Sequence, residues 1–276
     1  MILVIAEIIC IGNELLLGTI DNTNARWISK EVAAAGGFVK RISVVGDEID
    51  EISLAIKESL DRKPDWLIIT GGLGPTYDDK TLEAVAVALG SNLFLENSAV
   101  EMLKKSYARY SSNYKMDEIR LKMARIPNGA IPIQNPVGTA PSIILKNRND
   151  SANTNIVCLP GVPKEMEAIF IENILPKIKE IIGEFSIIEG NYEVIGASEA
   201  ELAPALSDIV ESNPRDSIYV KTHPRGYTED NKPKLRIQII SKGKDESKVQ
   251  LRYNNISNTL IEVIKKLNGT VLFVTA

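Results

Sequence analysis

The architecture of this chain follows from one stretch, Trp66-Leu67-Ile68-Ile69-Thr70-Gly71-Gly72-Leu73-Gly74-Pro75-Thr76-Tyr77-Asp78-Asp79-Lys80-Thr81. The apolar run at its start predicts a buried strand. Three glycines within four residues then let the backbone turn sharply and approach a ligand closely. Apolar residues next recur at helical spacing and predict a helix, at Leu82, Val85, Ala86 and Leu89. A strand, a glycine loop and a helix N-terminus in this order form an anion site, because N–H groups and the helix dipole point outward at one place.

Two adjacent carboxylates, Asp78 and Asp79, stand at the mouth of this loop. Carboxylates beside a phosphate would repel it unless a cation lies between them, so we infer a divalent metal ion of the Mg²⁺ or Co²⁺ type. The alternative is that both aspartates only cap the first helical turn, as aspartates often do. The stretch is neither a Walker A loop nor the dinucleotide fingerprint. The residues alone therefore predict a phosphate-like anion site with a metal ion.

The same alternation of strand and helix patterns extends over the first 180 residues and predicts a parallel sheet covered on both faces. In such sheets ligands bind beyond the carboxyl ends of the strands. Glu14, Asp47 and Asp79 follow three predicted strands, so we expect them at one rim. Three acidic residues at the same rim favour a site over simple capping.

The second half of this region continues with less regular patterns. Residues 98–124 are predicted to be helical, and their three tyrosines are expected to pack rather than to stack on a ligand. Residues 143–145 and 155–159 are predicted to be strands joined by a polar hairpin. Pro160-Gly161-Val162-Pro163 is then either a second turn that offers N–H groups or an ordinary connection to the next helix.

Composition restricts the class of protein. The chain has 276 residues, which suits two domains, and its 44% apolar and 25% charged residues are typical of a globular protein. The apolar start carries Glu7 and lacks a basic segment, so we expect a core strand there and not a signal peptide. Cys10 and Cys158 lie in apolar runs, as buried thiols of a reducing compartment do. With a net charge of −4 and no apolar run near ~18 residues, we expect a cytoplasmic protein that binds neither nucleic acid nor membrane.

Four ordered motifs carry a family resemblance. Residues 70–81 closely resemble the signature of the competence-damage-inducible CinA family, and three further stretches match it, at residues 12–24, 135–141 and 159–166. The region is also similar to the molybdopterin-binding fold of molybdopterin adenylyltransferases. The resemblance therefore implies a three-layer α/β/α domain with a parallel-rich sheet at residues 1–180.

The resemblance also implies a function, which is metal-dependent hydrolysis of the small-molecule nucleotide ADP-ribose to AMP and ribose 5-phosphate. In adenylyltransferase relatives the metal-binding acids occupy positions that fall here on Asp47 and Asp79, and the other expected catalytic residues are Asp78 and Glu14. The expected phosphate-binding residues are Gly71, Gly72, Leu73, Gly74, Thr76, Gly138 and Gly161. Two alternatives stay open: adenylate transfer to molybdopterin, and binding of a nucleotide or molybdopterin without turnover.

Residues 181–276 show the order β-α-β-β-α-β, which predicts a smaller, ferredoxin-like α+β domain. It resembles the KH-like domain of CinA proteins. Its central hairpin is basic, with Lys221, His223, Arg225, Lys232, Lys234 and Arg236. Because this half has no G-x-x-G loop, a solvated or dimer-forming hairpin is favoured over an RNA site, and we expect a homodimer. The C-terminal amidase domain of many bacterial CinA proteins is not expected here, because the chain ends at Ala276.

Overall fold

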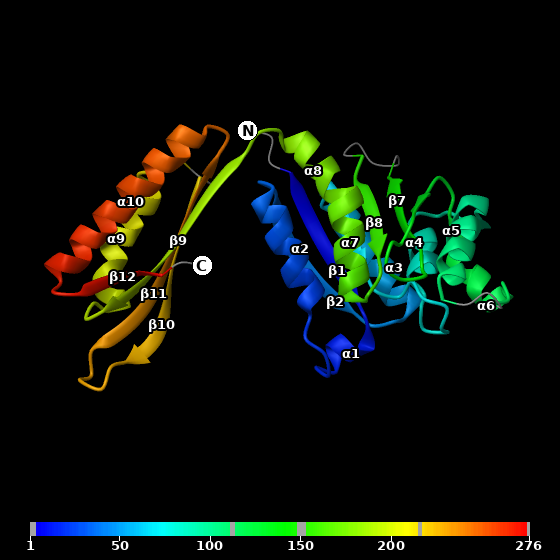
Figure 1. The fold of residues 1–276 in the computed structure, drawn as a ribbon, viewed down its shortest axis with the longest axis horizontal. Coiled ribbons are helices and arrows are strands. Elements are labelled where there is room, and N and C mark those ends of the chain that lie inside the picture. The colour runs from blue at the N-terminus through cyan, green and yellow to red at the C-terminus, as the bar shows by residue number, and fades with distance from the viewer. Residues whose placement is uncertain (1–3, 111–113, 148–152, 215–216, 275–276) are drawn as a thin grey trace. The chain divides into compact units, whose positions relative to one another are not determined.

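The computed structural model describes residues 4–110, 114–147, 153–214 and 217–274. The chain divides into two compact domains, Met1–Ile182 and Gly183–Ala276, close to the boundary expected from the sequence. Each domain consists of helices packed against a sheet (Figure 1). Within the described ranges, none of the helices has both the length and the apolar character needed to cross a membrane.

The first domain is built on a six-stranded sheet with the order β2-β1-β3-β8-β7-β6. The first four strands in this order run parallel, and β7 and β6 are antiparallel to their neighbours. This arrangement confirms the predicted parallel-rich sheet and the predicted hairpin between β7 and β8. The strands are β1 (Ile5–Ile11), β2 (Phe38–Val45), β3 (Trp66–Thr70), β6 (Ile131–Ile133), β7 (Ser142–Lys146) and β8 (Asn155–Leu159).

Helices cover both faces of this sheet, which makes the domain the predicted three-layer structure (Figure 1). On one face lie α3 (Ile49–Asp61), α4 (Thr81–Ala88) and α5 (Asn97–Ala108), with the two-stranded sheet of β4 (Leu93–Leu95) and β5 (Arg125–Pro127) beside them. On the other face lie α2 (Thr23–Ala34), α7 (Pro163–Ile169), the π-helical turn η2 (Phe170–Ile174) and α8 (Leu175–Ile182). The remaining short helices are α1 (Asn13–Leu16), α6 (Glu118–Leu121) and η1 (Lys122–Ala124).

The core explains why the strands are apolar on both sides. In β3 every residue is buried, and Leu67 and Ile69 pack in one cluster with Ile52 and Ile56 of α3. Ile68, between them in sequence, points to the opposite face because strand side chains alternate. A strand buried on both faces needs apolar residues throughout, as the run at residues 66–69 has.

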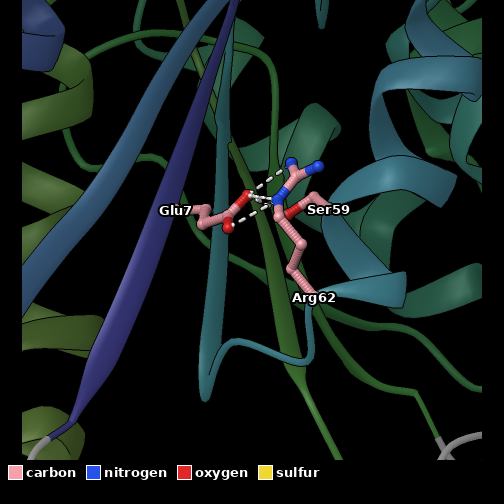
Figure 2. A network of polar contacts seen from close by, with 3 residues as sticks. All are labelled: Glu7, Ser59 and Arg62. Atoms are coloured by element: carbon pink, nitrogen blue, oxygen red, sulfur yellow. Dashed lines mark hydrogen bonds and ion pairs between the residues drawn. The ribbon is translucent and has the colours of Figure 1, made fainter.

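One charged side chain lies inside this core, near the start of β1. Glu7 is 2% exposed, and its carboxylate accepts hydrogen bonds from Ser59 Oγ at 2.9 Å and from Arg62 Nη2 at 2.7 Å (Figure 2). Burial disfavours the carboxylate, but the hydrogen bonds and charge of Arg62, with the bond from Ser59, hold the pKa of Glu7 below its ordinary value. The buried charge is therefore fully paired.

The prediction of one long helix over residues 98–124 is wrong. Helix α5 ends at Ala108, and α6 begins a new helix at Glu118, while residues 111–113 lie outside the described part. The physical reason is that a new helix begins after Asp117. Its Oδ1 accepts the Arg120 N–H at 3.0 Å and so caps the N-terminus of α6. The expected packing role of the tyrosines is seen at Tyr107, whose ring stacks on that of Tyr114 with centroids 5.7 Å apart.

The second domain is the predicted ferredoxin-like unit. Its antiparallel sheet has the order β10-β11-β9-β12, and α9 and α10 share one core with it. Strand β9 begins at Ser186, earlier than predicted, because β11 pairs with it from Lys234–Ile195 to Gly243–Ser186. The elements are β9 (Ser186–Ile195), α9 (Glu199–Glu211), β10 (Ile218–Tyr227), β11 (Pro233–Gly243), α10 (Glu246–Lys266) and β12 (Thr270–Val274).

Candidate functional site

The loops that follow β1, β2, β3 and β8 surround a crevice of about 400 Å³, which we call the acidic crevice. It lies at the carboxyl ends of the parallel strands, where ligands bind in sheets of this kind. The structure brings together here all the predicted site residues except Gly138. Those that line the crevice are Glu14, Asp47, Gly71, Gly72, Leu73, Gly74, Thr76, Asp78, Asp79 and Gly161.

The glycine loop has a backbone shape that only glycine tolerates well. Gly71 and Gly72 have φ angles of 108° and 64°, and a Cβ at Gly71 would clash with the carbonyl oxygen of Ile11. Thr81 Oγ1 donates to the Gly71 carbonyl at 2.7 Å and fixes the loop from behind. Within the described residues, the N–H groups of Gly72, Leu73 and Gly74 have no acceptor. Three successive unpaired N–H groups at a crevice form a cradle for an anion.

The two aspartates of the loop do not cap a helix. Helix α4 begins at Thr81, and Asp79 lies before it with its Oδ2 accepting from Thr76 N at 2.8 Å and from Thr76 Oγ1 at 2.6 Å. The same hydroxyl also contacts Asp78 Oδ1. One hydroxyl proton can serve only one carboxylate at a time, so the two carboxylates compete for it. This geometry excludes capping of α4 as the reason for this pair of acids.

Positive charge reaches this loop from outside the crevice. Lys122 Nζ donates to the Thr76 carbonyl, and Lys80 pairs with Glu48 at 3.3 Å. The hydrogen bond from Thr76 contributes most to a lowered pKa of Asp78, followed by its own backbone N–H and, more weakly, by these two lysines. Asp78 is therefore ionised at neutral pH.

The two acids that follow β1 and β2, Glu14 and Asp47, differ in what their carboxylates contact. Asp47 Oδ2 accepts the Asn13 N–H at 2.9 Å, which ties the loop after β2 to the loop after β1. The carboxylate of Glu14 folds back over Gly12, where a Cβ would clash with it. In the described part of the chain, the Glu14 carboxylate has no hydrogen-bond partner.

The sequence analysis missed Glu165, on the first turn of α7, which also lines the crevice. Its Oε2 accepts from Asn135 Nδ2 at 2.7 Å. Gly138, predicted to bind phosphate, does not line the crevice, and its N–H donates to Asn135 Oδ1 at 2.7 Å. Gly138 is a glycine because a Cβ would occupy the position of the Glu165 carboxylate. The available signal was the motif at residues 159–166, in which Glu165 resembled an ordinary first-turn acid.

The charge of the crevice restricts what can bind there. Its charged lining residues, among those the structure describes, are all carboxylates: Glu14, Asp47, Asp78, Asp79 and Glu165. An anion could enter only together with a cation. The described residues contain no group of three His, Cys, Asp or Glu side chains placed to hold a metal ion by themselves. The residues instead fit a hard cation held by one or two carboxylates and completed by phosphate and water, as Mg²⁺ often is.

The acidic crevice and the three unpaired N–H groups lie at the rim of a parallel-rich sheet in an α/β domain. A family model described as a probable molybdopterin binding domain matches residues 7–180, and the chain belongs to this family. A solved relative is the protein CinA of unknown function from Thermoplasma acidophilum, which is 40% identical, with a TM-score of 0.56 over 63% of this chain and 98% of that one. The resemblance to CinA is thereby confirmed.

Two further relatives extend over both domains. Protein SSO0103 of Saccharolobus solfataricus is 41% identical over 266 residues, which cover 96% of this chain and 94% of that protein. A protein of Sulfolobus acidocaldarius is 38% identical over 96% of this chain and 97% of its own length. Both relatives therefore match this chain over nearly all of its two domains.

Proposed function

We propose that the first domain binds molybdopterin, or a closely related phosphorylated pterin, in the acidic crevice together with a divalent cation. The proposal depends on one observation: the anion cradle and five carboxylates line the same crevice in a domain of the molybdopterin-binding family. The sequence leaves binding of molybdopterin open as an alternative to hydrolysis of ADP-ribose. The family match favours it over ADP-ribose as the ligand.

Each part of the crevice has a separate task in this proposal. The N–H groups of Gly72, Leu73 and Gly74 hold the phosphate oxygens, since they lack other acceptors among the described residues. Asp47 and Asp79 would hold the cation. When bound, the cation neutralises the phosphate against the carboxylates and acts as a Lewis acid.

Calorimetry of molybdopterin binding, with and without Mg²⁺ and under nitrogen, tests the proposal. We expect tight binding only when the cation is present. The variant Asp79→Asn should weaken binding about tenfold or more, because it removes a charge-assisted contact to the cation. The matched control is Asp208→Asn, the same chemical change on the exposed surface of α9 in the second domain, and it should bind as the parent does. Binding that is equally tight without cation and in Asp79→Asn would contradict the proposal.

A second candidate is turnover, namely metal-dependent hydrolysis of ADP-ribose to AMP and ribose 5-phosphate. It is favoured by Glu14, a carboxylate that lines the crevice and has no hydrogen-bond partner in the described part of the chain. Such a group can accept a proton from an attacking water. We expect release of AMP to require a divalent cation and to fall about a hundredfold or more in Asp79→Ala. Unchanged release of AMP in that variant would remove this candidate.

A further inference from the structure

A second cavity of about 280 Å³, which we call the side compartment, opens beside the acidic crevice. The two share four lining residues, so one ligand can extend from one into the other. These are Ile11, Glu14, Gly161 and Val162.

The side compartment differs from the acidic crevice in chemistry. Its own apolar wall includes Leu15, Ile20 and Pro163. Ile20 is 59% exposed and Val162 is 54% exposed, so two apolar side chains beside the cavity face solvent. A flat, largely apolar group placed here would cover them, which favours its binding.

One polar atom in this wall lacks a partner. Asn24 Nδ2 donates to the Gly161 carbonyl at 2.8 Å and to Thr70 Oγ1 at 3.0 Å. The reversed orientation of the amide would place its oxygen against the Gly161 carbonyl oxygen, so the orientation is fixed. Asn24 Oδ1 is consequently buried with no donor among the described residues. Buried acceptors are rarely left unpaired, and a ligand is one way to pair them.

We propose that the side compartment receives the nitrogen heterocycle of the ligand whose phosphate lies in the acidic crevice. The inference rests on the proposed function and adds a specificity to it. The ring is of a class that carries amide or amino N–H donors, as pterins and purines do, and one such donor pairs with Asn24 Oδ1. Because this atom is shielded from solvent, the ring reaches it only through a local movement of the wall around Asn24.

The first experiment compares a ligand with a ring to one without a ring. Neopterin monophosphate and glycerol 3-phosphate, each with Mg²⁺, are titrated against the parent protein, Ile20→Asp and Leu17→Asp. Ile20 lines only the side compartment, whereas Leu17, 76% exposed, lines neither cavity and is the matched control. We expect Ile20→Asp to weaken binding of the pterin about tenfold and to leave glycerol 3-phosphate unchanged. Leu17→Asp should change neither.

The outcomes separate this inference from the proposed function. Equal binding of the pterin by Ile20→Asp and the parent protein overturns the side compartment as the ring site, and so does a parent that binds the pterin no more tightly than glycerol 3-phosphate. Failure of the parent to bind molybdopterin, or either phosphate ligand, overturns the proposed function and the inference with it.

The second experiment tests Asn24. A neopterin monophosphate that is methylated at its amide nitrogen and dimethylated at its amino group cannot donate from those positions, so it should bind the parent less tightly than neopterin monophosphate does. In Asn24→Leu, which removes the acceptor, this difference should disappear, as in a double-mutant cycle. A difference of the same size in the variant and in the parent would overturn the role of Asn24. Thermal unfolding of the variant, compared with the parent, confirms that it is folded.

Discussion

Acidic side chains lie near both ends of strand β1, and they differ in whether a cationic side chain pairs with them. Near its start, Glu7 is buried and receives hydrogen bonds from both Ser59 and Arg62 (Figure 2). Beyond its end, the carboxylates of Glu14 and of Asp47, from the loop after β2, lie in a crevice whose described lining residues include no cationic side chain. Loss of one partner of the buried pair would destabilise the fold, whereas the carboxylates of the crevice repel one another and, in the proposed function, bind a cation and its ligand.

The largest expected effect follows from removing Arg62, the charged partner of Glu7. Arg62→Met should lower the free energy of unfolding of the first domain by about 3 kcal/mol, because it leaves Glu7 buried without its charged partner. Urea denaturation monitored by tryptophan fluorescence measures this. Arg26→Met, an exposed arginine on α2, is the control and should stay within about 0.5 kcal/mol of the parent. A loss as small as that of the control would show that the buried pair does not stabilise the fold.

A smaller loss is expected at the rim itself. Gly71→Ala should cost about 2 kcal/mol, because alanine is strained at a φ of 108° and its Cβ would clash with the Ile11 carbonyl. The matched control is Gly18→Ala, which has a φ of 68° but open space around its Cβ and should cost about 1 kcal/mol. Equal losses in the two variants would mean that the close approach at Gly71 has no energetic weight.

The pH dependence of stability provides a second test of the buried Glu7 carboxylate. Since the folded-state pKa of Glu7 lies below its ordinary value of 4.5, its contribution is fully present above pH 4.5. It is lost as the pH falls through the folded-state pKa, because the unfolded chain binds the proton more readily. Urea midpoints from pH 7 to pH 3 should therefore fall less steeply in Glu7→Gln than in the parent. Parallel curves would show that Glu7 is not more acidic in the folded state.

The smallest expected effect has the opposite sign. Glu14→Gln removes one like charge from the acidic crevice without breaking a side-chain hydrogen bond among the described residues, so it should stabilise the fold by about 0.5 kcal/mol at pH 7. The stabilisation should shrink at high salt, which screens exposed charges. Calorimetric unfolding at two salt concentrations measures both. A destabilised variant would show that the Glu14 carboxylate has an unrecognised structural partner.

Much of the site could be predicted because its residues follow strands. Asp47 follows β2, and Asp79 lies in the glycine loop after β3. Both strands run parallel to β1, which lies between them, and parallel strands end at the same edge of a sheet. Their proximity therefore follows from local patterns and one topological rule. The role of Gly138 could not be predicted this way, because its glycine requirement comes from Glu165, which lies beyond two strands, the hairpin that joins them and the start of α7.

The alternation of strands and helices, the sharp glycine turn after β3 and the acidic rim could be predicted from the amino-acid sequence alone, since each depends on residues close together in the chain. Which polar side chains form hydrogen bonds with each other depends on the tertiary structure. The contact of Asn24 with Gly161 joins residues 137 positions apart, and it leaves Asn24 Oδ1 without a donor among the described residues. Hydrogen bonds between distant segments depend on how α2 and α7 pack on the same face of the sheet, and no local pattern encodes that distance.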